Sequence, residues 1–197
     1  MYCAICRRLR FSILCKECLD LIWNARLRRE LSNGLKVFSS FAYSELGWLL
    51  HSKDAVIGSR VFRILGRRGV ECFFASYPAL LDLKRDEVGV ICIRNKRVGV
   101  YSHSAILARC FRRFGFKVFC NALISGNDLR FMRLSLEDRR EASREFRFHP
   151  PRSSRICAFI IVDDVVTTGQ TLLEASMLVE SLGFKALFAW TLCDARA

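Results

Sequence analysis

The sequence predicts an α/β fold, in which helices flank a mainly parallel sheet, preceded by a small cysteine-rich module. Residues 157–162 form a short apolar run that is typical of a buried strand. A helix with apolar residues on one face is expected over 171–182, followed by a second buried strand over 184–192. A strand, a helix and a strand in this order imply two parallel strands joined by a right-handed crossover.

The N-terminal segment differs from the rest, because four of the ten cysteines lie close together near the start of the chain. They form two pairs, Cys3-x2-Cys6 and Cys15-x2-Cys18, a spacing that can place four thiolates around one tetrahedral Zn²⁺. Four protein ligands leave no open coordination position, so we expect a structural zinc. Reduced cysteines without a metal are the alternative interpretation.

This module is too small to bury a core of its own, so zinc would stabilise it. We expect a helix over residues 19–31 to lead out of it, and Asn33-Gly34 to form the turn that follows. The chain is accordingly divided into a zinc-finger-like module, residues 1–35, and an α/β domain, residues 36–197.

The middle of the chain carries weaker patterns. Apolar residues recur at helical spacing within 44–68, and β-branched residues are concentrated in 88–93. The remaining expected elements are a strand over 36–43, a helix over 103–114 and a strand over 117–120. Residues 124–151 are polar and rich in arginine, which indicates a long loop with some helix, and loops of this length are usually functional.

Composition points to a cytoplasmic protein. The chain has 197 residues, of which 52% are hydrophobic, enough for one domain and a small accessory module. No apolar run is long enough to span a bilayer, and arginines follow Cys6 at once, unlike a signal peptide. Because the cytosol is reducing, we expect no disulfides. The six scattered cysteines are interpreted as small buried hydrophobic residues.

The segment after the strand 157–162 is suited to a phosphorylated sugar. Helix N-termini offer free N–H groups and a positive dipole to a phosphate, and a glycine lets the backbone approach it closely. The adjacent Asp163 and Asp164 would repel an anion, but they suit a sugar diol and Mg²⁺. An ordinary strand–helix connection with polar caps is the alternative. The candidate ligand-binding residues are Asp163, Asp164, Val165, Val166, Thr167, Thr168, Gly169, Gln170 and Thr171.

This segment resembles the motif with which type I phosphoribosyltransferases bind 5-phosphoribosyl-1-pyrophosphate (PRPP): a hydrophobic strand, two acids, then Thr-Thr-Gly and Thr. The resemblance implies that Asp163 and Asp164 contact the ribose hydroxyls and magnesium, and that residues 165–171 wrap the 5-phosphate. It also implies the fold of that family, a parallel sheet flanked by helices.

The combination of an N-terminal zinc module and a C-terminal PRPP motif resembles the ComF family, which is associated with natural competence in bacteria. Further similarity lies in residues 91–97, in the helix start near 105–109, and in the spacing of Leu134, Arg139 and Phe146. The prolines that the family has around the mid-chain strand are absent, and Ala142 replaces a usual Asn. The resemblance implies single-stranded DNA and competence or DNA-processing proteins as partners.

The chain is strongly basic, with a net charge of +13, and residues 88–127 contain no acidic residue. Such a charge attracts polyanions. Arg94, Lys96, Arg97 and the downstream Arg139 are candidates to bind pyrophosphate or DNA, with a solvated basic surface as the alternative. Aromatic residues between these charges suit base stacking, although most of them are expected to lie in the core.

Two functions follow from the sequence. The first is a PRPP- and magnesium-binding protein of the ComF type that handles single-stranded DNA during transformation. The second is an active phosphoribosyltransferase, in which a nitrogen nucleophile displaces pyrophosphate from PRPP. In that reaction Asp163 and Asp164 would be the catalytic residues, and Mg²⁺ and cationic side chains would stabilise the departing pyrophosphate.

Overall fold

The computed structural model describes residues 2–22, 26–50, 58–95, 102–125, 146–151 and 155–197. Within them, seven strands form one sheet in the order β1-β2-β7-β6-β3-β4-β5. The five inner strands are parallel, and the edge strands β1 and β5 pair antiparallel with their neighbours. The strands are β1 Leu27–Glu30, β2 Lys36–Ala42, β3 Val88–Asn95, β4 Lys117–Ser125, β5 Phe146–Phe148, β6 Ala158–Val166 and β7 Lys185–Asp194.

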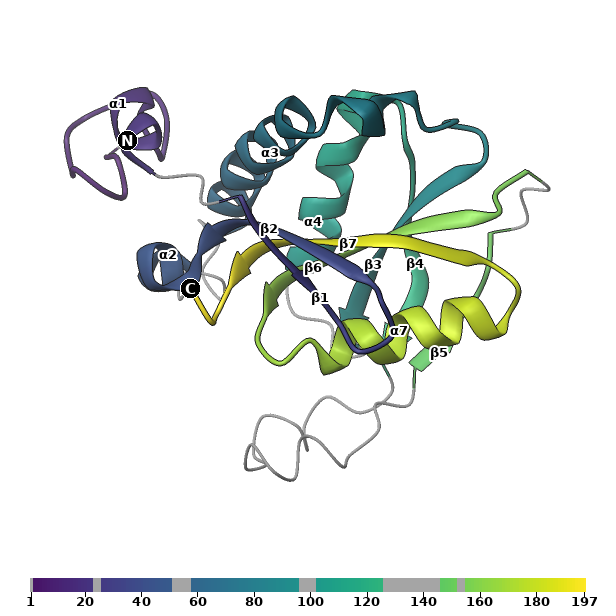
Figure 1. Ribbon diagram of the computed structural model, residues 1–197. Helices are drawn as coiled ribbons and strands as arrows, with labels where there is room; N and C mark the ends of the chain where they lie inside the picture. The colour runs from purple at the N-terminus through teal and green to yellow at the C-terminus, as the bar shows by residue number, and fades with distance from the viewer. Residues whose placement is uncertain (1, 23–25, 51–57, 96–101, 126–145, 152–154) are drawn as a thin grey trace.

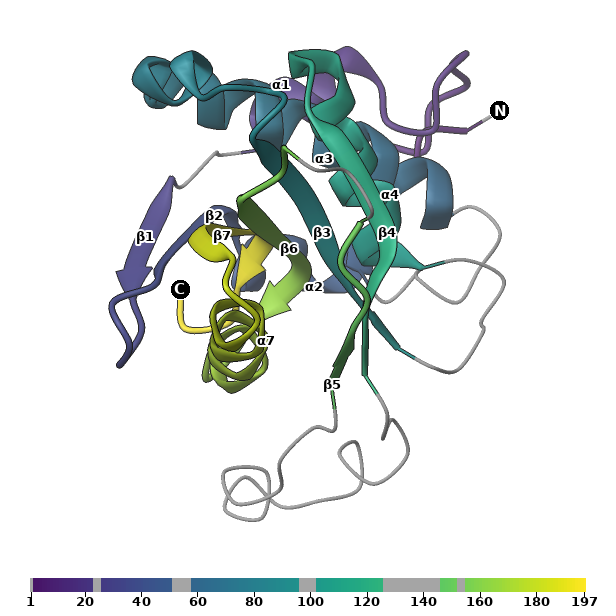
Figure 2. The ribbon, with the colours of Figure 1, turned by 90° about the vertical axis from the view of Figure 1, so that its right-hand side faces the viewer.

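Helices cover both faces of this sheet (Figures 1 and 2). The helices α3 and α4 pack on one face, and α7 packs on the other. The helices are α1 Lys16–Leu21, α2 Tyr43–Leu50, α3 Gly58–Ser76, α4 His103–Cys110 and α7 Gln170–Ser181, with short 3-10 helices at Pro78–Asp82 and Phe111–Phe114. The arrangement confirms the predicted α/β class, with a parallel sheet between helices.

The central strand β6 explains the two hydrophobic cores. Its alternate residues Ala158, Ile160 and Val162 belong to the core under α3 and α4, whereas Phe159 and Ile161 belong to the core under α7. All five are at most 5% exposed. A strand buried on both faces has no reason to alternate apolar with polar residues, which is why this segment is one continuous apolar run.

The connections that follow β3 and β6 lead in opposite directions along the sheet, so the strand order reverses between these two strands. From β3 the chain passes through α4 to β4 on one side, and from β6 it passes through α7 to β7 on the other. Because both crossovers are right-handed, the opposite directions put α4 and α7 on opposite faces. The point where the strand order reverses lies between β3 and β6, which is where open α/β sheets bind ligands.

The expected helix over residues 19–31 is wrong in its second half. Helix α1 ends at Leu21, and residues 27–30 form strand β1, in which intermediate and exposed residues alternate. Pairing of β1 with β2, from Leu27 opposite Ser39 to Glu30 opposite Lys36, satisfies its backbone in place of helical hydrogen bonds. The predicted boundary at residue 35 falls between β1 and β2, and residues 27–30 on its N-terminal side belong to the sheet.

The expected long loop over residues 124–151 also needs a correction at its two ends. Strand β4 continues to Ser125, and residues 146–148 form β5, which pairs antiparallel with β4 from Leu123 opposite Phe148 to Ser125 opposite Phe146. An edge strand of three residues carries too little periodicity to be recognised in the sequence. Residues 126–145 between them lie outside the described part of the chain.

The N-terminal module lies beside α3 (Figure 1). Its residues Ile13 and Leu14 are buried in the same hydrophobic core as α3 and α4. The guanidinium of Arg68 on α3 lies 3.3 Å from the carboxylate of Asp20 on α1. Among the helices that the structure describes, none combines the length and apolar character needed to cross a bilayer.

Candidate functional site

The residues of the predicted phosphate loop lie at the carboxyl end of β6, beside the point where the strand order reverses. Strand β6 does not end at Val162, as the sequence suggested, but continues to Val166. The reason is the length of β7, whose residues Thr191 and Asp194 pair with Asp163 and Val166. The two acids therefore lie within a rigid strand, and only residues 167–169 form the connection to α7.

Asp163 accepts hydrogen bonds from Ser104 and from the amide of Asp164. The hydroxyl of Ser104 in the first turn of α4 donates to Asp163 Oδ1 at 3.1 Å, and the amide of Asp164 donates to the same oxygen at 2.9 Å. Ser104 is buried, whereas Asp163 is half-buried. The start of α4, which follows β3, thus touches the end of β6. This contact brings together the two strands between which the sheet reverses.

Asp164 turns its carboxylate toward the next peptide. Its Oδ1 accepts a hydrogen bond from the amide of Val165 at 2.9 Å. Asp164 is half-buried. Both carboxylates lie near the carboxyl end of β6, and carboxylate oxygens are groups that suit Mg²⁺ and vicinal hydroxyl groups.

The connection to α7 presents backbone donors. Gly169 has a φ of +88°, the left-handed conformation that favours glycine, and it precedes the first residue of the helix. Thr167 and Thr168 are exposed. Within the described part of the chain, the amides of Thr168, Gly169 and Thr171 donate to no carbonyl group outside the regular elements, while that of Gln170 donates to Thr168 Oγ1 at 3.3 Å. Among the described residues, the start of α7 therefore has N–H groups without a backbone acceptor outside the regular elements; Thr168 is exposed, whereas Gly169 is buried.

The β1–β2 hairpin lies against this connection, an arrangement that no sequence pattern predicted. The guanidinium Nη1 of Arg29 in β1 donates to the carbonyl of Thr167 at 2.8 Å, although the two residues are 138 positions apart. A contact between segments so distant in the chain leaves no local signal in the sequence.

The predicted basic residues are only partly described. Arg94 lies near the end of β3 and donates through Nη1 to the side-chain oxygen of Asn121 on β4. Its position at the carboxyl end of β3 places it at the same edge of the sheet as Asp163. Lys96, Arg97 and Arg139 lie outside the described residues.

The aromatic residues of the basic stretch divide between the core and its edge. Phe111 and Phe116 are 0% and 3% exposed and cannot stack on a base. Phe114 and Phe119 are partly buried and pack against the two cores. This confirms the interpretation of most of these residues as core.

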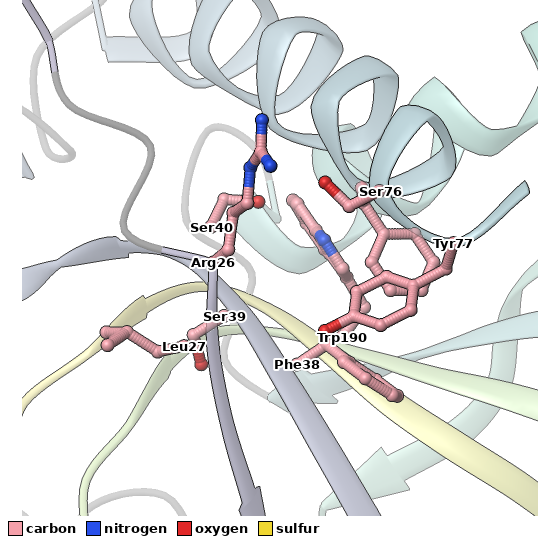
Figure 3. Close-up of a pocket in the computed structure, with 9 residues that line it drawn as sticks. Arg26, Leu27, Phe38, Ser39, Ser40, Ser76, Tyr77 and Trp190 are labelled. Atoms are coloured by element: carbon pink, nitrogen blue, oxygen red, sulfur yellow. The ribbon is translucent and has the colours of Figure 1, made fainter.

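A small hollow lies elsewhere, between the C-terminal end of α3 and the strands β1, β2 and β7 (Figure 3). Its empty volume is about 210 Å³, including space open to solvent. It shares no residue with the segment 163–171. The candidate site is recognised instead by the position of its residues at the reversal of the strand order, since this is where α/β sheets bind ligands. The hollow is lined by Arg26, Leu27, Phe38, Ser39, Ser40, Phe73, Ser76, Tyr77 and Trp190.

The four N-terminal cysteines form a second candidate site. Their sulfur atoms all lie within 4.8 Å of one another, and Cys6 Sγ lies 3.8 Å from Cys15 Sγ. A tetrahedral zinc with Zn–S bonds of about 2.3 Å requires sulfur atoms about 3.8 Å apart. The four residues could therefore hold a metal ion such as zinc, as their spacing predicted.

The protonation of these thiols is consistent with a site for a cation. Burial raises the pKa of Cys3, but hydrogen bonds from the backbone at Cys15, Cys6 and Ile5 outweigh it and bring the pKa down to about 6. Contact with the Cys15 thiol, together with burial, raises the pKa of Cys18 to about 12. Crowded thiols resist losing all their protons, whereas a bound metal ion stabilises the thiolates.

Cys92 of β3 and Cys120 of β4 form a further pair beneath the start of α4. The Cys92 thiol lies 3.6 Å from the carbonyl oxygen of Cys120, and the Cys120 thiol lies 4.0 Å from that of Ala105. Hydrogen bonding from Cys92 lowers the pKa of Cys120 to about 6, despite partial burial, and the charge of Arg109 acts in the same direction. The same contact raises the pKa of Cys92. The interpretation of these cysteines as small buried hydrophobic residues is confirmed for Cys92, whereas Cys120 is only partly buried, and the sequence contained no signal for their pairing.

Comparison with known proteins identifies no family. No family model and no curated protein matches the chain. Among solved structures, the crystal structure of orotate phosphoribosyltransferase from Aeropyrum pernix is similar, with 16% sequence identity and a TM-score of 0.33. The match covers 86% of this chain and 75% of that one. A likeness at this TM-score carries no argument about this protein.

Proposed function

We propose that this protein binds PRPP, or a closely related phosphoribosyl ligand, together with Mg²⁺ at Asp163, Asp164 and residues 165–171. The observation that carries the proposal is the meeting of two acids and a free helix N-terminus at the reversal of the strand order. This edge is the usual ligand position in open α/β sheets.

Each part of the ligand has a matching group in the site. The free amides of residues 168–169 and the positive end of the α7 dipole suit the 5-phosphate. The carboxylates of Asp163 and Asp164 suit the ribose diol and would hold Mg²⁺ directly or through water. When bound, Mg²⁺ would neutralise the pyrophosphate group. Arg94, at the end of β3, would lie on the pyrophosphate side.

We infer further that the protein is of the ComF type, in which PRPP binding accompanies the handling of single-stranded DNA during natural transformation. Two observations support a polyanion as partner: the net charge of +13, and the exposed guanidinium groups of Arg109, Arg112 and Arg113 beside the end of α4. Arg113 is paired with Glu71 at 2.7 Å, whereas Arg109 and Arg112 have no ion pair among the described residues. Zinc at the four cysteines would be structural.

The alternative function is an active transferase. A nitrogen nucleophile would attack C1 of the ribose as the bond to pyrophosphate breaks, and the charge on pyrophosphate would increase as it leaves. Asp163 and Asp164 would then be catalytic, because they hold the ribose and the metal at the reacting carbon. Release of pyrophosphate with a panel of nitrogen acceptors would favour this function over simple binding.

The test of the binding proposal is calorimetric titration of the full chain with PRPP, in the presence and absence of Mg²⁺. We expect binding that requires Mg²⁺ and that weakens by at least roughly a hundredfold in the Asp163→Asn/Asp164→Asn variant, since two lost charged contacts together remove about 3 kcal/mol or more. A matched control is Asp82→Asn/Asp86→Asn, which removes two carboxylates far from β6 in the sequence. Equal binding by both double variants would refute the site.

The DNA proposal needs its own measurement. Affinity for a fluorescent single-stranded oligonucleotide should fall steeply as salt rises, because phosphate binding releases counterions. Replacing Arg109 and Arg112 by Gln should reduce the salt dependence. Affinity that does not change with salt would rule out the electrostatic model.

A further inference from the structure

The inference concerns Arg29, a residue of the edge strand β1 that lies next to the candidate phosphate loop. Its side chain is only 16% exposed. Nη1 donates to the carbonyl of Thr167 at 2.8 Å, and Nε lies 3.4 Å from Asp194 Oδ2. A single guanidinium thus joins three strands: β1, the end of β6 and the end of β7.

The rest of the hairpin supports this contact. Leu31, which follows β1, approaches Gly169 so closely that a Cβ on Gly169 would lie 2.5 Å from Leu31 Cδ2. Asn33 in the turn donates through Nδ2 to the hydroxyl of Ser176 on α7 at 2.9 Å. The hairpin therefore contacts the connection at Thr167 and Gly169 and the middle of α7 at Ser176, and Arg29 is the residue that binds the Thr167 carbonyl.

The contact fixes the orientation of a donor. The peptide between Thr167 and Thr168 is planar, and in a trans peptide the C=O and N–H groups point in opposite directions. Since Arg29 binds the carbonyl on the hairpin side, the N–H of Thr168 points away from the hairpin. This is one of the free amides that the proposed function assigns to the phosphate.

The guanidinium of Arg29 also has N–H groups that donate to no acceptor among the described residues. Within the described residues, Nη2 and Nε are buried and make no hydrogen bond. Asp194 is the one acid within ion-pair distance of Arg29 among these residues, and that acid also accepts from the amide of Arg196 at 2.9 Å. A buried cation with spare donors next to an anion site strengthens that site electrostatically.

We propose that Arg29 is a positioning residue for the phosphate: it locks the Thr167–Thr168 peptide so that the Thr168 amide faces the ligand. This inference rests on the proposed function, because it assumes a phosphate at residues 167–169. It also gives the β1–β2 hairpin a role in the site. Arg29 does not touch the ligand through the contacts described, so it acts through the peptide.

The experiment compares two adjacent arginines of the same strand. Arg29→Met removes the guanidinium that binds Thr167, and Arg28→Met removes the neighbouring, exposed one, which lies over the Phe38 ring at 5.9 Å. Both variants lose one positive charge from β1. Calorimetry with PRPP and Mg²⁺ at fixed salt should show roughly tenfold weaker binding for Arg29→Met, the scale of one lost charged hydrogen bond, and little change for Arg28→Met.

A second readout distinguishes positioning from general stability. Amide NMR signals of Thr168 and Gly169 should shift when PRPP and Mg²⁺ are added to the wild type and to Arg28→Met. In Arg29→Met the Thr168 shift should be much smaller even when the ligand is saturating. Arg29→Lys should partly restore affinity, because its ammonium can bind Thr167 but cannot bind Asp194 as well.

The outcomes separate the two proposals. If the wild type does not bind PRPP, the proposed function and this inference fail together. If the wild type binds and the two Met variants bind equally well with equal Thr168 shifts, the role of Arg29 is overturned while the proposed function stands. If Arg29→Met does not fold, Arg29→Lys takes its place against Arg28→Lys, and equal affinities of this pair overturn the inference.

Discussion

Single residues at the carboxyl edge of the sheet are held by partners from distant segments. Ser104, at the start of α4, fixes the carboxylate of Asp163 in β6, and Arg29 in β1 fixes the carbonyl of Thr167. Each contact involves a charged group, and such hydrogen bonds are about twice as strong as neutral ones. The candidate site is thereby oriented before a ligand arrives, which reduces the entropy lost on binding.

The Cys92–Cys120 pair gives a prediction at this scale. Because the pKa of Cys120 is lowered to about 6, its reactive thiolate is present above that pH and is lost as pH falls through about 6. Labelling of Cys120 by iodoacetamide, followed by peptide mass spectrometry, should therefore reach half its maximal rate near pH 6. An unperturbed thiol would reach half its maximal rate near pH 8.5, which is roughly two and a half pH units higher.

The control for this measurement is Cys92→Ala. Removing the Cys92 thiol removes the largest cause of the lowered pKa, so the labelling curve of Cys120 should move to higher pH. A curve that is the same in both proteins would contradict the proposed contact between the two thiols.

At the scale of elements, the start of α7 depends on the hairpin that lies over it. Gly169 and Gly183 flank the helix, and both have a positive φ, of 88° and 84°. They differ in surroundings: Leu31 crowds Gly169, whereas no atom lies within 4 Å of a Cβ on Gly183. A comparison of alanine substitutions at the two glycines therefore distinguishes the effect of backbone strain, which both share, from that of steric contact with Leu31, which only Gly169 has.

We predict that Gly183→Ala lowers the free energy of unfolding by about 1–2 kcal/mol, the strain of a left-handed residue. Gly169→Ala should lower it further, because Leu31 must move and the hairpin with it. Urea unfolding measures both values. In a Leu31→Ala background the difference between the two glycine variants should disappear, and a difference that persists there would mean that Leu31 is not its cause.

At the scale of the whole molecule, one hydrophobic core lies on each face of the sheet, and the small N-terminal module packs against one of them. The module contributes Ile13 and Leu14 to the core under α3 and α4, yet its own cluster consists mainly of Cys3, Cys15 and Cys18. A unit with so few apolar residues depends on a metal for its stability. The large sheet, by contrast, is buried on both faces.

We therefore predict one zinc per chain in protein prepared without chelator, measured by atomic emission. Cys18→Ser should lose the zinc and make residues 2–22 sensitive to proteases, while the sheet stays folded by circular dichroism. Cys157→Ser, which changes an exposed cysteine outside the cluster, should keep it. Full zinc occupancy in Cys18→Ser would exclude a four-cysteine site.

Several features of this molecule followed from the sequence alone because their signals are local. The apolar run before Asp163, the helix after Gly169 and the paired spacing of the four cysteines all depend on neighbouring residues. Periodicity and short motifs report such features directly. They were enough to predict the α/β class, the strand–helix–strand unit and the cluster of four cysteines that could hold a metal ion.

Only the tertiary structure decided the remaining features, since they depend on pairing between distant segments. Strand β1 forms because it pairs with β2, and β5 forms because it pairs with β4. Strand β6 extends through Asp163 and Asp164 because β7 is long enough to pair with it there. The contact of Arg29 with Thr167 spans 138 residues. A hydrogen bond across such a distance is set by the order of strands in the sheet, which no local pattern encodes.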